Sequence, residues 1–120
     1  MLLAYADAAY ASQCGRHFRR LGWEVHMVAS GTEARELAHQ YRPDAVVLDV
    51  ALLDQSGWLT SAKISLEKPD LLIILVADRQ TGNLEERRSM VGADHAICRE
   101  DGPQGLFQAI FGTAHLSEAV

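Results

Sequence analysis

Short apolar runs and amphipathic helix patterns alternate along the whole chain, and this alternation restricts the possible folds more than any other feature. The runs that predict strands cover residues 2–5, 24–28, 44–49, 71–76 and 95–98. Helical spacing or helix-start signals predict helices over 9–21, from 30 to just before Pro43, over 56–66, over 83–91, and after Gly102-Pro103. Strands that are separated by helices pair in parallel. The sequence therefore predicts an α/β fold with helices on both faces of a parallel sheet.

The apolar residues within each helical segment predict which helix faces point toward the sheet. Spacings of three or four residues place such residues in a single stripe. For the first three helices the predicted inward residues are Ala11, Cys14, Phe18 and Leu21; then Ala34, Leu37, Ala38 and Tyr41; then Leu59, Ala62 and Leu66. A Ser-x-x-Glu pattern from Ser30 to Glu33 predicts the start of the second helix.

The two most apolar runs, 44–49 and 71–76, read as buried central strands. Right-handed crossovers leave few arrangements, and the doubly wound, flavodoxin-like order 2-1-3-4-5 suits a chain of 120 residues best. In open parallel sheets, ligands bind at the carboxyl ends of the strands. We therefore expect Asp7, Asp49 and the segment 76–78 to surround one crevice, with Asp49 at the tip of a central strand.

Composition excludes several classes of function. The formal net charge of −5 does not favour a surface for nucleic acid. Cys14 and Cys98 lack metal-ligand spacing, and we expect reduced thiols, as in a cytosolic protein. No segment approaches the roughly 20 apolar residues of a membrane span, and the N-terminus lacks the basic region of a signal peptide. We expect a cytoplasmic protein that binds neither nucleic acid nor membrane.

Four motifs resemble those of the receiver domain of response regulators and stand in that family's order and spacing. Response regulators act in two-component and phosphorelay signalling. The four motifs are the strand ending in Asp49 (43–49), Gly57-Trp58, Gly92-Ala-Asp94, and the helix start Gly31-x-Glu33-Ala34. The resemblance covers residues 2–111 approximately. It implies one receiver domain over residues 1–120, in which 112–120 either extend the last helix or begin a linker.

The resemblance also implies roles for individual residues. Asp49 would be the phosphoacceptor, taking a phosphoryl group from a sensor histidine kinase or phosphotransfer protein. The family's Mg²⁺ ligands would correspond to Asp7, Asp49 and the backbone carbonyl of Ala51, and the ion offsets charge on the phosphoryl oxygens. A hydroxyl on the fourth strand and a lysine after the fifth normally hold those oxygens, and Val76 and Arg99 stand at these positions.

The chain departs from the family pattern at five positions: Ala6 replaces an acid, Val76 the hydroxyl, Ala96 an aromatic, Arg99 the lysine and Glu100 a proline. A valine cannot donate a hydrogen bond, and an arginine fork differs from a compact ammonium. We expect weak or lost Mg²⁺ binding and missing switch residues. Two hypotheses stay open: a receiver that is phosphorylated on Asp49 but signals differently, and a pseudo-receiver that binds proteins without phosphorylation.

An enzyme is not expected. The loop after the first strand is a poor phosphate cradle for a flavin, and Ala51 stands where a dehalogenase-type phosphatase needs a second acid. The family implies that an output domain or a partner binds the face of the fourth helix, fifth strand and fifth helix, and a homodimer is a further arrangement we consider. A non-proline cis bond is costly, so we expect a trans Arg99–Glu100 bond and a loop that moves Arg99 away from the place a lysine would occupy.

Overall fold

Five parallel strands form one sheet in the order β2-β1-β3-β4-β5, which confirms the predicted topology. In this computed structural model the backbone is described for residues 1–119 and the side chains for residues 1–112. The strands are β1 (Leu2–Ala4), β2 (His26–Val28), β3 (Ala45–Asp49), β4 (Leu72–Ala77) and β5 (His95–Cys98). Because β3 and β4 lie inside the sheet, every residue of β3 is buried, as are five of the six in β4.

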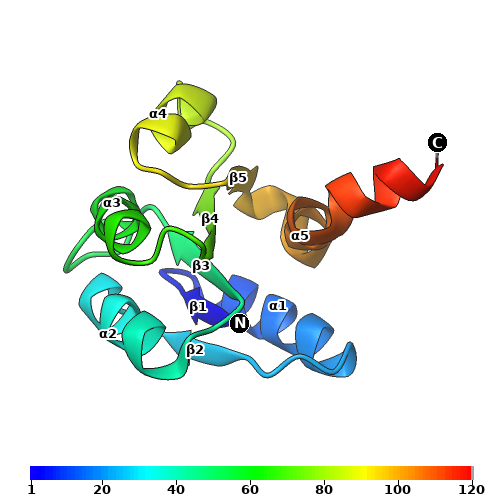
Figure 1. Cartoon of the computed structure of the whole chain (residues 1–120), viewed down its shortest axis with the longest axis horizontal. Helices are drawn as coiled ribbons and strands as arrows, with labels where there is room; N and C mark the ends of the chain where they lie inside the picture. Colours follow the sequence, from blue (N-terminus) through cyan, green and yellow to red (C-terminus); the bar gives the residue numbers. More distant parts are fainter. Residues whose placement is uncertain (120) are drawn as a thin grey trace.

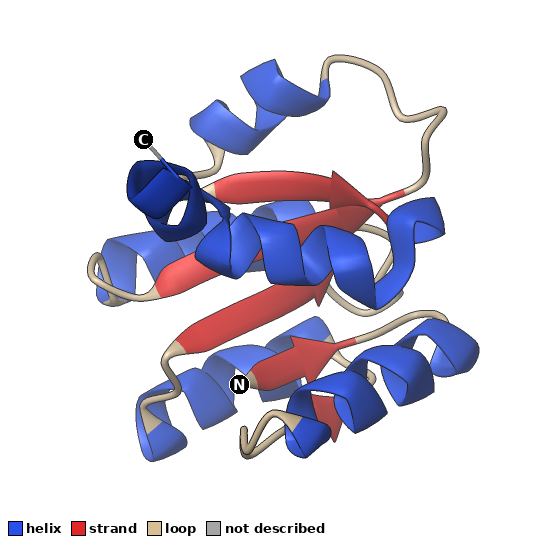
Figure 2. Cartoon of the chain, turned by 90° about the vertical axis from the view of Figure 1, so that its right-hand side faces the viewer, coloured by secondary structure: helices blue, strands red, loops and turns tan. Residues whose placement is uncertain are grey.

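Helices cover both faces of the sheet (Figure 2). They are α1 (Ala8–Arg20), α2 (Gly31–Tyr41), α3 (Gly57–Glu67), α4 (Leu84–Met90) and α5 (Gly102–Ala119) (Figure 1). A short 3₁₀ helix, η1 (Arg99–Asp101), precedes α5. The helical backbone of α5 continues to Ala119, so most of the segment 112–120 extends that helix. None of the described helices is both long and apolar enough to cross a membrane.

Two apolar clusters lie on opposite faces of the sheet. One contains Ala34 and Ala38 of α2 and Ile64 of α3, and the other contains Phe18 of α1 and Leu106 of α5. Successive strand residues point to opposite faces. In β3, Val46 and Leu48 accordingly join the α2–α3 cluster, and Val47 joins the α1–α5 cluster. The same alternation directs the next odd-numbered residue, Asp49, toward the α1–α5 face.

Several predicted inward residues are exposed instead. Leu66 of α3 is 85% exposed and Tyr41 at the end of α2 is 59% exposed, and Leu59 and Leu21 are each about half exposed. The buried face of α3 carries Thr60, Ser61 and Ile64. Polar residues can face inward here because their hydroxyls are satisfied: Thr60 donates to the carbonyl of Ser56 and Ser61 to that of Val91. Hydrophobicity alone therefore indicated the wrong face of α3.

Both cysteines are free thiols, and their burial differs. Cys14 is fully buried on the inner face of α1, and Cys98 at the end of β5 is partly exposed. Burial raises the pKa of the Cys14 thiol to about 11, since a thiolate loses solvation in an apolar cluster. The reactive thiolate form of Cys14 is therefore scarce near neutral pH.

We expect a thiol reagent such as iodoacetamide to modify Cys98 in the native protein and to leave Cys14 unmodified. Mass spectrometry of peptides after a timed reaction measures both sites, and a urea-unfolded sample shows that Cys14 reacts once exposed. The pKa of Cys14 is higher in the folded protein than in the unfolded chain, so the burial of this thiol stabilises the fold fully only below the unfolded thiol pKa. The free energy of unfolding then decreases as pH rises from that value toward about 11. Equal labelling of both native thiols would contradict the buried placement of Cys14.

Candidate functional site at the carboxyl edge of the sheet

Asp49 is the last residue of β3 and, among the side chains of residues 1–112, the one buried acid, with 3% of its surface exposed. Its neighbour across the strand pair is Val76 of β4, which is also buried. Partners in adjacent parallel strands point to the same face, so Val76 lies beside Asp49 on the α1–α5 side. The strand β4 runs one residue further than predicted, to Ala77. Neither Val76 nor Ala77 has a hydroxyl to donate.

Arg99 binds the carboxylate of Asp49 with one end of its guanidinium. Its Nη2 donates to both oxygens of Asp49, at 3.1 Å to Oδ1 and 3.0 Å to Oδ2. The backbone N–H of Ala51 also donates to Oδ1, at 2.9 Å. The side chain of Asp49 is 4% exposed and that of Arg99 is 24% exposed, so the pair is largely removed from water. Bonds between charged partners in such a place are stronger than neutral ones.

The Arg99–Glu100 bond is trans as predicted, and the side chain of Arg99 still reaches the Asp49 carboxylate in the crevice. The reason lies in the length and direction of the side chain, which reaches Asp49 from the first residue of η1. Glu100 turns away to accept a bond from the backbone N–H of Arg79, and this bond is the main cause of its lowered pKa. The charge of Glu100 is thus directed toward the loop after β4.

Asp7, the predicted metal ligand, caps the N-terminus of α1. Its Oδ1 accepts bonds from the backbone N–H groups of Ala9 (2.9 Å) and Tyr10 (3.2 Å). Asp7 is exposed, and it follows β1, the strand beside β3, so it lies at the same sheet edge as Asp49. Within the part of the chain that is described, no three His, Cys, Asp or Glu side chains gather in a way that could hold a metal ion.

Asp54 joins the loop after β3 to the start of α2. Its carboxylate accepts bonds from the backbone N–H groups of Gly31 and Thr32 and from the hydroxyl of Ser30. The bond from Gly31 is the first cause of the lowered pKa of Asp54. An acid at a helix N-terminus also favours the helix dipole. Asp54 thus has a structural role and holds the loop that follows Asp49.

Sequence reasoning missed Tyr10, which is 5% exposed in the α1–α5 cluster with Val76. Its hydroxyl and the Nε of Arg99 are the buried side-chain polar atoms that lack a hydrogen-bond partner among the described residues. The signal was present in the helix pattern, because Tyr10 precedes Cys14 by four residues and shares its inward face.

Gly57, where α3 begins, lies against the backbone of Asp49. A Cβ atom there would come within 2.7 Å of the Asp49 carbonyl carbon and 2.8 Å of the Val50 Cα. These neighbours are backbone atoms, so they cannot yield as a flexible side chain would. The close approach explains why glycine is needed at this position.

We expect Gly57→Ala to lower the free energy of unfolding by about 1–3 kcal/mol, the usual range for overpacking. Urea titration followed by circular dichroism measures the change. The matched control is Gly82→Ala, because a Cβ at Gly82 meets nothing within 4 Å. The interpretation fails if the two variants are equally stable.

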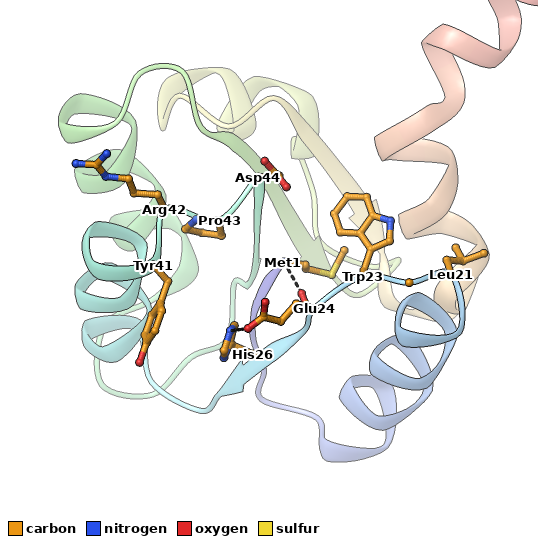
Figure 3. Close-up of a pocket in the computed structure, with 10 residues that line it drawn as sticks. Met1, Leu21, Trp23, Glu24, His26, Tyr41, Arg42, Pro43 and Asp44 are labelled. Carbon is orange, nitrogen blue, oxygen red and sulfur yellow. Dashed lines mark hydrogen bonds and ion pairs between the residues drawn. The ribbon is translucent and has the colours of Figure 1, made fainter.

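The cavity shown in Figure 3 lies at the opposite edge of the sheet from Asp49. It has a volume of about 500 Å³ and is lined by residues that precede or flank β1, β2 and β3, among them Met1, Glu24, His26 and Asp44. The N-terminal ammonium of Met1 donates to the carbonyl of Glu24 at its rim. This cavity therefore contributes nothing to the candidate site.

Comparison with solved structures shows the same fold in proteins of low sequence identity. A CheY-like response regulator receiver domain protein from Methanospirillum hungatei JF-1 has a TM-score of 0.84 at 20% identity, over 98% of this chain and 94% of that one. A response regulator from Burkholderia pseudomallei has a TM-score of 0.81 at 19% identity, over 99% of this chain and 71% of that one. The latter structure contains a phosphorylated aspartic acid, a calcium ion and citrate.

Comparison with curated proteins finds partial matches. "Probable transcriptional regulatory protein TcrX" of Mycobacterium tuberculosis (strain ATCC 25618 / H37Rv) is 33% identical over 76 residues, which are 63% of this chain and 32% of that protein. "Protein-glutamate methylesterase/protein-glutamine glutaminase 3" of Anaeromyxobacter dehalogenans (strain 2CP-C) is 30% identical over 80 residues, 66% of this chain and 23% of that protein. This chain thus spans a third or less of each relative's length.

The model of one protein family matches nearly the whole chain. It is described as the response regulator receiver domain and matches residues 2–111, the same range as the resemblance in sequence motifs. Receiver domains are non-catalytic modules of two-component signalling, in agreement with the fold and with an acid at the tip of β3. The chain belongs to the response regulator receiver domain family.

Proposed function

We propose that this receiver domain accepts a phosphoryl group on Asp49 and that Arg99 serves as the cation that holds it. The observation that carries the proposal is the pairing of the buried Asp49 carboxylate with Arg99 at the carboxyl edge of the sheet. The donor would be the phosphohistidine of a sensor histidine kinase or phosphotransfer protein, as is typical of the family. Such a partner places the domain in the cytoplasm.

In the transfer, an Asp49 carboxylate oxygen attacks phosphorus while the bond from phosphorus to the donor nitrogen breaks, and the electron pair returns to that nitrogen. The guanidinium of Arg99 has already approached both carboxylate oxygens, so a small movement brings its N–H groups to the new phosphoryl oxygens. The N–H of Ala51 stays directed at the same carboxylate. Val76 can provide only a packing contact.

Mg²⁺ fits this donor set poorly. Both oxygens of Asp49 face a guanidinium, Asp7 is engaged at the N-terminus of α1, and Ala6 has no carboxylate. Hard cations of this kind bind best where several oxygen ligands are free. We infer that Mg²⁺ binds weakly, through Asp7, Asp49 and the Ala51 carbonyl, and only after Arg99 is displaced.

The test is phosphorylation by acetyl phosphate, followed on a phosphate-affinity gel with and without Mg²⁺. We expect slow modification of the wild type, little dependence on Mg²⁺, and none in Asp49→Asn. Ala6→Asp restores the family's second acid and should raise the Mg²⁺ dependence. Modification that persists in Asp49→Asn, or that needs micromolar Mg²⁺, would contradict the proposal.

The second candidate is a pseudo-receiver that binds proteins without phosphorylation. The observation that favours it is that Val76 and Ala96 lack the donor and the ring that normally couple phosphorylation to the face of α4, β5 and α5. A partner, or a second copy, would bind on that face, where a depression of about 620 Å³ lies over β5.

Affinity for a partner in wild type and Asp49→Asn, each with and without beryllofluoride, separates the two candidates. A roughly tenfold gain with beryllofluoride that disappears in Asp49→Asn supports phosphorylation-dependent signalling. Equal affinity in all four measurements supports the pseudo-receiver, because a ligand shifts an equilibrium only through differential contacts.

A further inference from the structure

Two buried hydrogen-bond donors without partners lie in the same region of the molecule. They are the hydroxyl of Tyr10 and the Nε–H of Arg99, and no other buried side-chain polar atom of the described residues lacks a partner. Buried polar groups are nearly always hydrogen-bonded, and each exception requires an explanation. Arg99 contacts Asp49 through Nη2 alone, so its Nε–H remains available beside the acceptor.

Tyr10 is placed on the same face and at the same end of the sheet as Asp49. It is the third residue of α1, which begins at the carboxyl edge after β1, and it packs in one cluster with Val76, the cross-strand partner of Asp49. The Cys14 thiol lies close enough to the hydroxyl to raise its pKa as a weak neighbour, but no hydrogen bond of acceptable geometry joins the two side chains. Burial is the main cause of the raised pKa of Tyr10, and Asp49 and Arg99 also act on it, in opposite directions.

Hydrogen-bond donors that stay unpaired beside the Asp49 carboxylate can find acceptors once the carboxylate is phosphorylated. The unmodified Asp49 already receives bonds from Arg99 and from the N–H of Ala51. A phosphoryl group adds three acceptor oxygens at this place. On β4 the family hydroxyl that would meet one of them is absent.

We propose that the Tyr10 hydroxyl and the Arg99 Nε–H bind oxygens of a phosphoryl group carried by Asp49, so that α1 supplies the hydroxyl that β4 lacks. This inference rests on the proposed phosphorylation of Asp49. Tyr10 donates a hydrogen bond and stays protonated, and the covalent step is the transfer described above. Tyr10 is thus a phosphoryl-binding residue, whereas the helix pattern indicated only that its side chain faces inward.

The test uses Tyr10→Phe, which removes only the hydroxyl, and beryllofluoride as the probe, at one Mg²⁺ concentration for both proteins. We expect the variant to bind beryllofluoride roughly tenfold more weakly than the wild type. Its acetyl-phosphate-derived phosphoprotein should also decay faster. Because the hydroxyl has no partner in the unmodified protein, thermal unfolding of the variant should be unchanged or shifted upward. Tyr41→Phe is the matched control, since Tyr41 is exposed and stacks on His26 at the other edge of the sheet.

The outcomes separate this inference from the proposed function. If the wild type binds beryllofluoride and Tyr10→Phe binds it equally well, the hydroxyl contacts only water and the inference is overturned, while phosphorylation of Asp49 stands. If the wild type binds no beryllofluoride and takes no phosphate, both fail. Inorganic phosphate is a third arm: binding that persists in Asp49→Asn and weakens in Tyr10→Phe would identify a free-anion site and overturn the link to phospho-Asp49.

Discussion

Arg99→Gln should lower the free energy of unfolding by about 3 kcal/mol, the lower end of what removing one partner of a buried ion pair costs. The variant leaves the Asp49 carboxylate buried with the N–H of Ala51 as its remaining partner. We place the loss at the lower end because a quarter of the Arg99 side chain is exposed. Urea-induced unfolding of both proteins measures the difference.

The cost arises from an uncompensated charge, and this can be tested separately. Arg99→Gln combined with Asp49→Asn removes both charges and should recover most of the lost stability. Arg79→Gln is the control, because Arg79 pairs with Asp101 at the surface, where both side chains are about half exposed or more, and exposed pairs contribute little. If the double variant is as unstable as Arg99→Gln, the loss comes from packing, and the ion pair is not what stabilises the site.

Arg99→Gln should also change phosphorylation, because Arg99 is the proposed cation for the phosphoryl group. Without the guanidinium, the carboxylate is less hindered but the phosphoryl group loses its cation. We therefore expect Arg99→Lys, which keeps the charge, to retain phosphorylation by acetyl phosphate better than Arg99→Gln.

Phe18→Ala should lower the free energy of unfolding by about 3–5 kcal/mol, the range measured for large-to-small changes at buried aromatic residues. Phe18 is fully buried on the inner face of α1, and its ring meets the edge of Trp23 at a centroid distance of 5.6 Å. Removing the ring loses this contact and leaves a cavity between α1 and the sheet. Thermal and urea unfolding, monitored by circular dichroism, give the change.

Leu66→Ala is the control for this prediction. It removes an apolar side chain of similar chemistry, but Leu66 is 85% exposed, and substitutions at such sites stay within about 0.5 kcal/mol. If both variants lose a similar amount of unfolding free energy, α3 packs through Leu66, as its hydrophobic pattern predicts. That result would overturn the packing described for α3.

The strand order and the central position of β3 and β4 were predictable because the information is local. A run of apolar β-branched residues marks a buried strand wherever it occurs, and handedness leaves few ways to connect five of them. Ser30 capping α2 through Glu33 is another local feature, and the structure confirms it. The buried face of α3 was not predictable in this way, since Thr60 and Ser61 become suitable for burial only through bonds to Ser56 and Val91.

The sequence by itself determined the α/β class, the sheet order and the place of Asp49 at the carboxyl end of a central strand. These depend on spacing along the chain and on the steric rules for parallel strands. Only the tertiary structure decided that Arg99 reaches Asp49, 50 residues away in sequence, and that Tyr10 is buried on the same face with its hydroxyl unpartnered. Contacts of this kind depend on side-chain direction and on which groups remain unpaired after packing, and neither is encoded in any local pattern.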